Sequence, residues 1–109
     1  MKINVLGTEY TLIETNDKAD PRLASVGDGY CDTSTKECVV DEMAVTDVNC
    51  KANLPFYKKS VIRHELIHAF LFESGLDVSS DWAAQEEMVD WIAIQFPKLL
   101  EAFKTADCL

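Results

Sequence analysis

The only two histidines of the chain, His64 and His68, stand four residues apart in the segment VIRHELIHAF. This spacing places both imidazoles on one face of an α-helix, about one turn apart. The residues around them are mostly apolar, namely Val61, Ile62, Leu66, Ile67, Ala69, Phe70 and Phe72. Burying two imidazoles and the carboxylate of Glu65 there is costly unless these groups are paired or coordinated. The segment therefore predicts a core helix whose histidines bind one metal ion.

The pattern His-Glu-x-x-His also indicates which metal to expect. Zinc favours imidazole nitrogens in a tetrahedral arrangement, and catalytic zinc sites leave one position for water. Glu65 follows the first histidine and can reach that water as a general base. We therefore expect His64 and His68 to be Zn2+ ligands and Glu65 to be catalytic. The alternative is a helix that carries two histidines by coincidence.

A third protein ligand must be a carboxylate or a thiolate, because no histidine remains. In the segment QEEMVDWIAIQF, Glu86 falls in a helical sector that core residues would otherwise occupy. Glu87 points roughly 100° away and is the alternative ligand. Asp90, one turn after Glu86, is placed to accept a hydrogen bond from a ligand histidine and to fix its tautomer.

Strand patterns precede the histidine helix, and helical patterns follow it. Residues 2–15 predict a hairpin, residues 16–29 a connection with one short helical turn, and residues 30–41 a second hairpin around the turn TST. Pro55 then precedes a predicted helix over residues 57–74, which Gly75 closes.

The C-terminal part predicts further helices. Ser79, Ser80 and Asp81 are N-cap candidates for a helix over about residues 82–96, and Pro97 should kink it or begin a separate C-terminal helix, KLLEAFKTA. Strands first and helices afterwards predict an α+β fold with a small antiparallel sheet. The chain of 109 residues is 48% hydrophobic, which suits one domain over residues 1–109.

HELIH followed by EEMVDWIA resembles the zincin metallopeptidases with a Glu third ligand, especially the compact ImmA/IrrE-like proteins of phages and prophages. The resemblance covers roughly residues 58–96. It implies a minimal, gluzincin-like fold in which His64, His68 and Glu86 hold zinc and Glu65 is the base for peptide hydrolysis by a zinc-bound water. Ile67 departs from the pattern, because these proteins often have Gly there. The DNA-binding extension of some relatives is not seen, so a role in transcription is not expected.

Charge and hydropathy limit the partners that we expect. Nineteen acidic and ten basic residues give a formal net charge of −9, which disfavours nucleic acids and anionic lipid surfaces. No window approaches the roughly 20 apolar residues of a membrane span, and the N-terminus lacks the apolar stretch of a signal peptide. We expect a cytoplasmic protein that acts on a peptide or protein substrate. The oligomeric state stays open.

The cysteines include no CxxC pair, so reduced thiols are expected. Cys31 and Cys38 can face each other across the second hairpin, which leaves a disulfide open. Cys38 or Cys50 as a fourth zinc ligand would instead indicate a structural site. That reading belongs to a zinc-stabilised interaction protein of phage type, the main alternative to a peptidase. A deformylase-like hydrolase is a weaker one, because no convincing upstream ligand motif with Cys is present.

A peptidase also needs a donor for the oxyanion that develops on the scissile carbonyl. Tyr30, Tyr57 and Arg63 are the candidates, and the sequence does not choose among them. Peptide substrates commonly add a strand to an exposed sheet edge. The resemblance to the zincin metallopeptidases implies that the second arm of the second hairpin, KECVVD, is this edge if the hairpin lies beside the metal helix.

Overall fold

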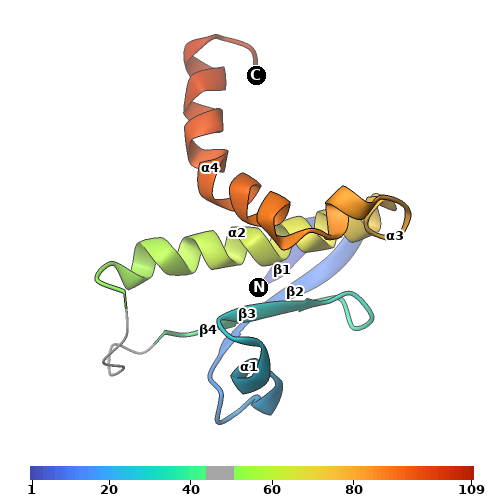
Figure 1. Cartoon of the computed structure of the whole chain (residues 1–109), viewed down its shortest axis with the longest axis vertical. Coiled ribbons are helices and arrows are strands. Elements are labelled where there is room, and N and C mark those ends of the chain that lie inside the picture. The colour runs from blue at the N-terminus through green and yellow to red at the C-terminus, as the bar shows by residue number, and fades with distance from the viewer. Residues whose placement is uncertain (44–50) are drawn as a thin grey trace.

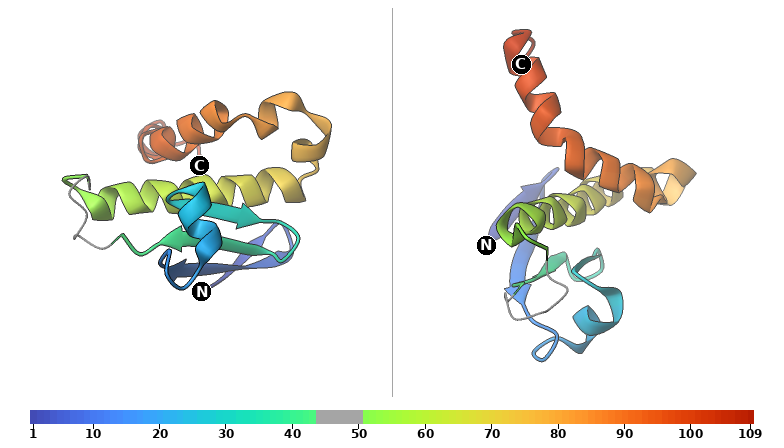
Figure 2. Two further views of the ribbon diagram at one scale, coloured as in Figure 1. Left: turned by 60° about the horizontal axis from the view of Figure 1, so that its bottom comes forward. Right: turned by 60° about the vertical axis from the view of Figure 1, so that its left-hand side comes forward.

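The computed structural model describes residues 1–43 and 51–109 of an α+β protein. A four-stranded sheet lies on one side of helix α2 (Leu54–Glu73), and helix α4 (Glu86–Thr105) lies on its other side. Figure 2 shows these parts as three successive layers with α2 in the middle. The helix that carries both histidines is therefore the central layer, as its apolar sequence requires.

The sheet consists of β1 (Lys2–Val5), β2 (Thr8–Thr15), β3 (Gly29–Asp32) and β4 (Glu37–Asp41), in the order β1-β2-β4-β3. The pairs β1–β2 and β3–β4 are antiparallel, which confirms both predicted hairpins. The first hairpin turns at Leu6 and Gly7, both with positive φ, as a two-residue type I′ turn requires. Between the hairpins, helix α1 (Pro21–Val26) is the predicted short helical turn.

The prediction of an antiparallel sheet is wrong at the centre, where β2 and β4 pair in parallel. The connection through α1 leads to β3, which begins at the end of the sheet where β2 ends and runs antiparallel to it, so β4 returns between them in the same direction as β2. As a result β4 is an inner strand, and Cys38, Val39 and Val40 are buried. The prediction that KECVVD forms the exposed edge is also wrong, because β3 occupies that edge.

The core joins the sheet to α2 and α2 to the C-terminal helices. One cluster consists of Val5, Tyr10, Cys38 and Ala69. A second cluster consists of Leu71, Ala83 and Val89, from α2, the 3₁₀ helix η1 (Asp81–Ala84) and α4. These two clusters fix the position of the histidine helix from both sides.

The helix boundaries differ from the predicted ones at the start of α2 and at the start of α4. Helix α2 begins at Leu54 because Asn53 caps it, and Pro55 lies in its first turn rather than before it. Gly75, with φ 84°, follows the last turn of α2 as predicted, and the short helix α3 (Leu76–Ser79) comes next.

Helix α4 begins at Glu86, later than predicted, since residues 81–84 form η1 instead. The predicted N-caps are therefore wrong for α4, whose N-cap is Gln85, without a side-chain hydrogen bond. Pro97 lies inside α4, so a separate C-terminal helix is not formed, although α4 changes direction along its length (Figure 1). No helix among the described residues is long and apolar enough to cross a membrane.

Candidate metal centre

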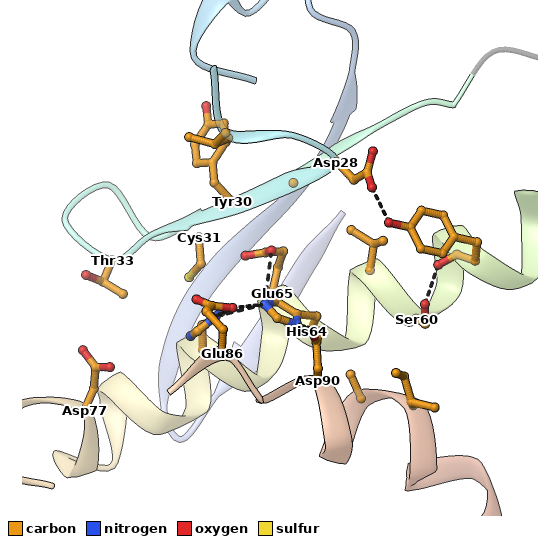
Figure 3. Close-up of a pocket in the computed structure, with 17 residues that line it drawn as sticks. Asp28, Tyr30, Cys31, Thr33, Ser60, His64, Glu65, Asp77, Glu86 and Asp90 are labelled. Atoms are coloured by element: carbon orange, nitrogen blue, oxygen red, sulfur yellow. Dashed lines mark hydrogen bonds and ion pairs between the residues drawn. The ribbon is translucent and has the colours of Figure 1, made fainter. Parts of the chain in front are cut away.

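Two helices bring the predicted ligands together. Helix α2 carries His64 and His68 one turn apart, and the first turn of α4 carries Glu86. One ligand atom from each of these residues lies within 4.8 Å of the others, so the group is close enough to bind a metal ion. Figure 3 shows the Glu86 side chain extending from α4 toward the ring of His64 on α2.

The distances between these atoms suit a shared ion. His64 Nε2 lies 3.1 Å from His68 Nε2 and 2.8 Å from Glu86 Oε2. His68 Nε2 lies 3.2 Å from Glu86 Oε1. Ligand atoms about 2.0–2.2 Å from a tetrahedral ion are roughly 3.3 Å apart, which is close to this spacing. The three side chains therefore fit a single small cation.

The hydrogen bond of the second ring nitrogen of His64 also supports a metal ion at this position. His64 Nδ1 lies 2.7 Å from Asp90 Oδ1. A carboxylate only accepts, so Nδ1 carries the proton and Nε2 of the neutral ring is an acceptor. That acceptor faces the carboxylate of Glu86, which is favourable only if a further proton or a metal ion lies between them. The predicted tautomer-fixing position of Asp90 matches this geometry.

Glu65 lies beside the group but is not part of it. The residue is 6% exposed. His64 Nε2 lies 3.9 Å from Glu65 Oε1. Burial raises the pKa of Glu65 to about 7; the electrostatic interaction with His64 lowers this pKa, and the interactions with Glu86 and Asp90 raise it. A buried carboxyl with such a pKa is suited to exchanging protons near neutral pH.

Gly29 is a site residue that the sequence did not reveal. A Cβ atom there would lie 3.0 Å from the Val39 carbonyl oxygen, 3.1 Å from Val61 Cγ1 and 3.3 Å from Glu65 Cγ. Strand β3 therefore passes close to α2 at Glu65 because residue 29 has no side chain. In the sequence, Gly29 stood in a run of turn-forming residues, and only the fold shows this close approach.

An open pocket of about 670 Å³ joins the ligand group to the edge strand. Its walls come from β3, α2 and α4, as Figure 3 shows. The carboxylates of its lining are Asp28, Glu65, Asp77, Glu86 and Asp90. Among the described lining residues there is no Lys or Arg. The pocket is therefore anionic and disfavours phosphates and other anions.

The three candidate oxyanion donors are all bonded elsewhere. The Tyr57 hydroxyl donates to Asp28, and the Tyr30 hydroxyl donates to Asp20 Oδ2 at 2.5 Å. Burial first, and then these carboxylates, raise the pKa of each tyrosine to about 12. Arg63 Nε donates to the main-chain oxygen of Ala93 at 2.6 Å. Both tyrosines line the pocket, but neither directs a free O–H group at the metal ligands.

The remaining predictions concern Glu87 and the cysteines. Glu87 is exposed and belongs to neither the ligand group nor the pocket lining. Cys31 and Cys38 are free thiols with their sulfurs 3.7 Å apart, and neither belongs to the described ligand group. The prediction for Cys50 lies outside the described residues.

Comparison of the chain with protein-family models, with curated proteins and with solved structures finds no match. The function must therefore be argued from the site itself.

Proposed function

We propose that the chain is a zinc metallopeptidase of minimal zincin type. One observation carries the proposal: the donor atoms of His64, His68 and Glu86 lie within 4.8 Å of one another, in an open pocket, next to the buried carboxyl of Glu65. Three protein ligands and a neighbouring acid–base group are typical of catalytic zinc sites, whereas structural sites are usually closed by four ligands. Imidazole nitrogens and a carboxylate are ligands that zinc commonly takes.

Each residue of the site has one task in this proposal. His64, His68 and Glu86 hold the ion, and Asp90 keeps His64 in the tautomer that directs Nε2 at it. When bound, zinc lowers the pKa of a water molecule and polarises the scissile carbonyl. Glu65 accepts a proton from the attacking water and later delivers it to the departing amine nitrogen. Water is consumed, and a carboxylate and an amine are released.

The substrate would lie along β3. The N–H group of Asp41 donates to the carbonyl of Asp28 at 2.9 Å, and these residues are opposite each other in the β3–β4 register. Bonded and non-bonded pairs alternate in an antiparallel ladder, so the main-chain polar groups of Gly29 and Cys31 point toward the free edge. Because this edge borders the pocket, an extended peptide can pair with β3 and present a carbonyl to the metal group.

Metal analysis combined with two substitutions tests the proposal. We expect one zinc per wild-type chain, and we expect Glu86→Gln to weaken zinc binding because a charged ligand is lost. Glu87→Gln is the matched control, since it removes the same charge at an exposed neighbouring position. Glu65→Gln should keep zinc but abolish cleavage of a peptide library. A wild type that binds no zinc, or a Glu65→Gln variant that cleaves as well as wild type, would contradict the proposal.

One observation favours a second candidate, a zinc-stabilised interaction protein. The hydroxyl groups of Tyr30 and Tyr57 donate to Asp20 and Asp28, and Arg63 does not belong to the pocket lining, so none of the three candidates is in place as an oxyanion donor. In this candidate the ion serves folding, and Glu65 has no chemical task. The same experiment decides between the two: a zinc-loaded wild type that cleaves no peptide in a diverse library supports the interaction protein.

A further inference from the structure

Pro97 leaves one carbonyl of α4 without its regular partner. In an α-helix the carbonyl of residue 93 accepts from the N–H group of residue 97, and proline has no N–H group. Pro97 lies inside α4, and Ala93 is 1% exposed, so water does not readily replace the missing donor. A buried carbonyl without a partner destabilises the folded protein.

Arg63 of α2 supplies the missing donor. Its Nε donates to the Ala93 oxygen at 2.6 Å, a short hydrogen bond from a charged group. The bond crosses from α2 to α4, and Arg63 immediately precedes the ligand His64. Because Pro97 has no N–H group, the Ala93 carbonyl can accept a hydrogen bond from Arg63, and this bond links α2 to α4.

The Arg63–Ala93 bond lies in the contact between α2 and α4 that also includes the proposed metal ligands. We call this contact the seam. Glu86, Asp90, Ala93 and Pro97 follow one another at intervals of four, three and four residues, so they share one face of α4. Along this face Glu86 approaches His64 and His68, Asp90 approaches His64, and Ala93 bonds to Arg63. The Arg63 bond lies at the end of the seam closest to Pro97.

Few neighbouring atoms pack around the two carboxylates of the seam, those of Glu86 and Asp90. The side chains of Glu86 and Asp90 are 68% and 61% exposed. The buried residues of α4, all of which is described, are Val89 and Ala93. The position of Glu86 relative to the histidines therefore depends on how α4 is held against α2 rather than on neighbours around the carboxylate.

We infer that Arg63 is a positioning residue of the metal centre: through the carbonyl that Pro97 frees, it fixes α4 on α2 and so places Glu86 and Asp90. The inference rests on the proposed zinc site but not on catalysis. It also gives Arg63 a different task from the oxyanion donor that the sequence suggested.

A double-mutant cycle on zinc affinity tests the inference. Arg63→Met keeps an unbranched side chain but has no N–H donor, so it should weaken zinc binding by roughly 10–100-fold, the usual range for residues that orient ligands. Pro97→Ala restores an N–H group for the Ala93 carbonyl, so the carbonyl no longer depends on Arg63. In that background, we expect Arg63→Met to change the zinc affinity only a few-fold. Competition with a chromophoric chelator measures all four affinities.

Controls separate this role from charge and from folding. Arg22→Met removes the same charge on α1, outside the α2–α4 seam, and should leave zinc affinity unchanged. Circular dichroism checks that each variant is folded. If Arg63→Met does not fold, Arg63→Ala replaces it in the same cycle, because alanine also has no side-chain N–H donor and favours the helix.

Three results would overturn the inference. One is an unchanged zinc affinity in Arg63→Met. Another is an equal loss of affinity when Arg63→Met is made in the wild type and in the Pro97→Ala variant. The third is coupling in the free energy of unfolding of the metal-free protein without coupling in zinc affinity, which would make the bond purely structural. A wild type that binds no zinc overturns the metal site as well, whereas a zinc-binding chain without peptidase activity overturns only the proposed function.

Discussion

Two glutamates of the site differ sharply in their surroundings. The Glu65 side chain is 8% exposed, and the Glu86 side chain is 68% exposed. Burial disfavours the charged form of a carboxyl, whereas contact with water favours it. Burial raises the pKa of Glu65 to about 7. Two helices thus place the same type of residue in two environments, which in the proposed function correspond to two tasks, proton transfer by Glu65 and metal binding by Glu86.

Asp90 offers a test at the scale of one residue. Replacing it by alanine removes the acceptor for His64 Nδ1, which lies 2.7 Å away. The imidazole can then rotate or adopt the other tautomer, so we expect zinc affinity to fall by about tenfold. Glu87→Gln again serves as the control for charge. Equal zinc affinities of wild type and Asp90→Ala would show that Asp90 does not orient His64.

Local sequence determined most of the site, because its parts are set by helical spacing. His64, Glu65 and His68 lie within one turn and a half, and the phase of α4 brings Glu86 rather than Glu87 close to the two histidines, as the sequence predicts. Gly29 was missed because its importance comes from a strand and a helix that are distant in sequence. The hydrogen bonds of Tyr30, Tyr57 and Arg63 were missed for the same reason.

At the scale of elements, the hairpins were predictable and their arrangement was not. Alternation and turn residues mark each hairpin, but nothing local shows that β4 pairs in parallel with β2. That pairing decides which strand is the edge, and so it moves the proposed substrate edge from β4 to β3. The late start of α4 has a similar cause, since η1 packs Ala83 into a core cluster with Leu71 and Val89.

The β3–β4 hairpin also brings two thiols close enough together to form a disulfide on oxidation. Cys31 and Cys38 are directly opposite each other, at a position where the strands are not hydrogen-bonded and side chains are closest. Their sulfurs are 3.7 Å apart and need only a small movement to reach the roughly 2.05 Å of a disulfide. We expect glutathione disulfide to convert the pair to an intramolecular disulfide with release of reduced glutathione.

Mass spectrometry of the oxidised protein checks this prediction through the loss of two hydrogens per chain. The bond should raise the free energy of unfolding by about 2–3 kcal/mol, because it closes a short loop in the unfolded chain. Cys31→Ser should prevent both changes. Hydrogen bonding with Cys38 and burial raise the pKa of the Cys31 thiol, so the reaction should be slow at neutral pH. A pair that stays reduced at equilibrium would contradict the prediction.

At the scale of the whole molecule, α2 lies between the sheet and α4, and the group formed by His64, His68 and Glu86 joins α2 to α4. The sheet packs on one side of this helix, and α4 docks on the other (Figure 2). Residues 101–109 are exposed throughout, so the C-terminal end of α4 contributes little to docking. The carboxylates of the anionic pocket are part of a formal net charge of −9, and both would favour the approach of cationic peptides.

Removing the metal should therefore loosen α4 more than the sheet. Glu86 is the proposed ligand on α4, and without an ion its carboxylate faces the acceptor nitrogen of His64. We expect a chelator to increase amide hydrogen exchange in residues 86–96, with little change in β2 and β4. Hydrogen-exchange mass spectrometry of the zinc-loaded and chelated protein measures both regions. Equal changes in α4 and the sheet would contradict this expectation.

The distribution of the ligands along the chain has a consequence for synthesis. A ribosome makes His64 and His68 first, and Glu86 follows only after α3 and η1. Pro97, which frees the carbonyl for Arg63, is made later still. A nascent chain that stops before these residues holds two histidines but neither the third ligand nor the bond that secures its helix. The complete centre can therefore arise only after α4 has been made, so products truncated before Glu86 should lack zinc-dependent activity.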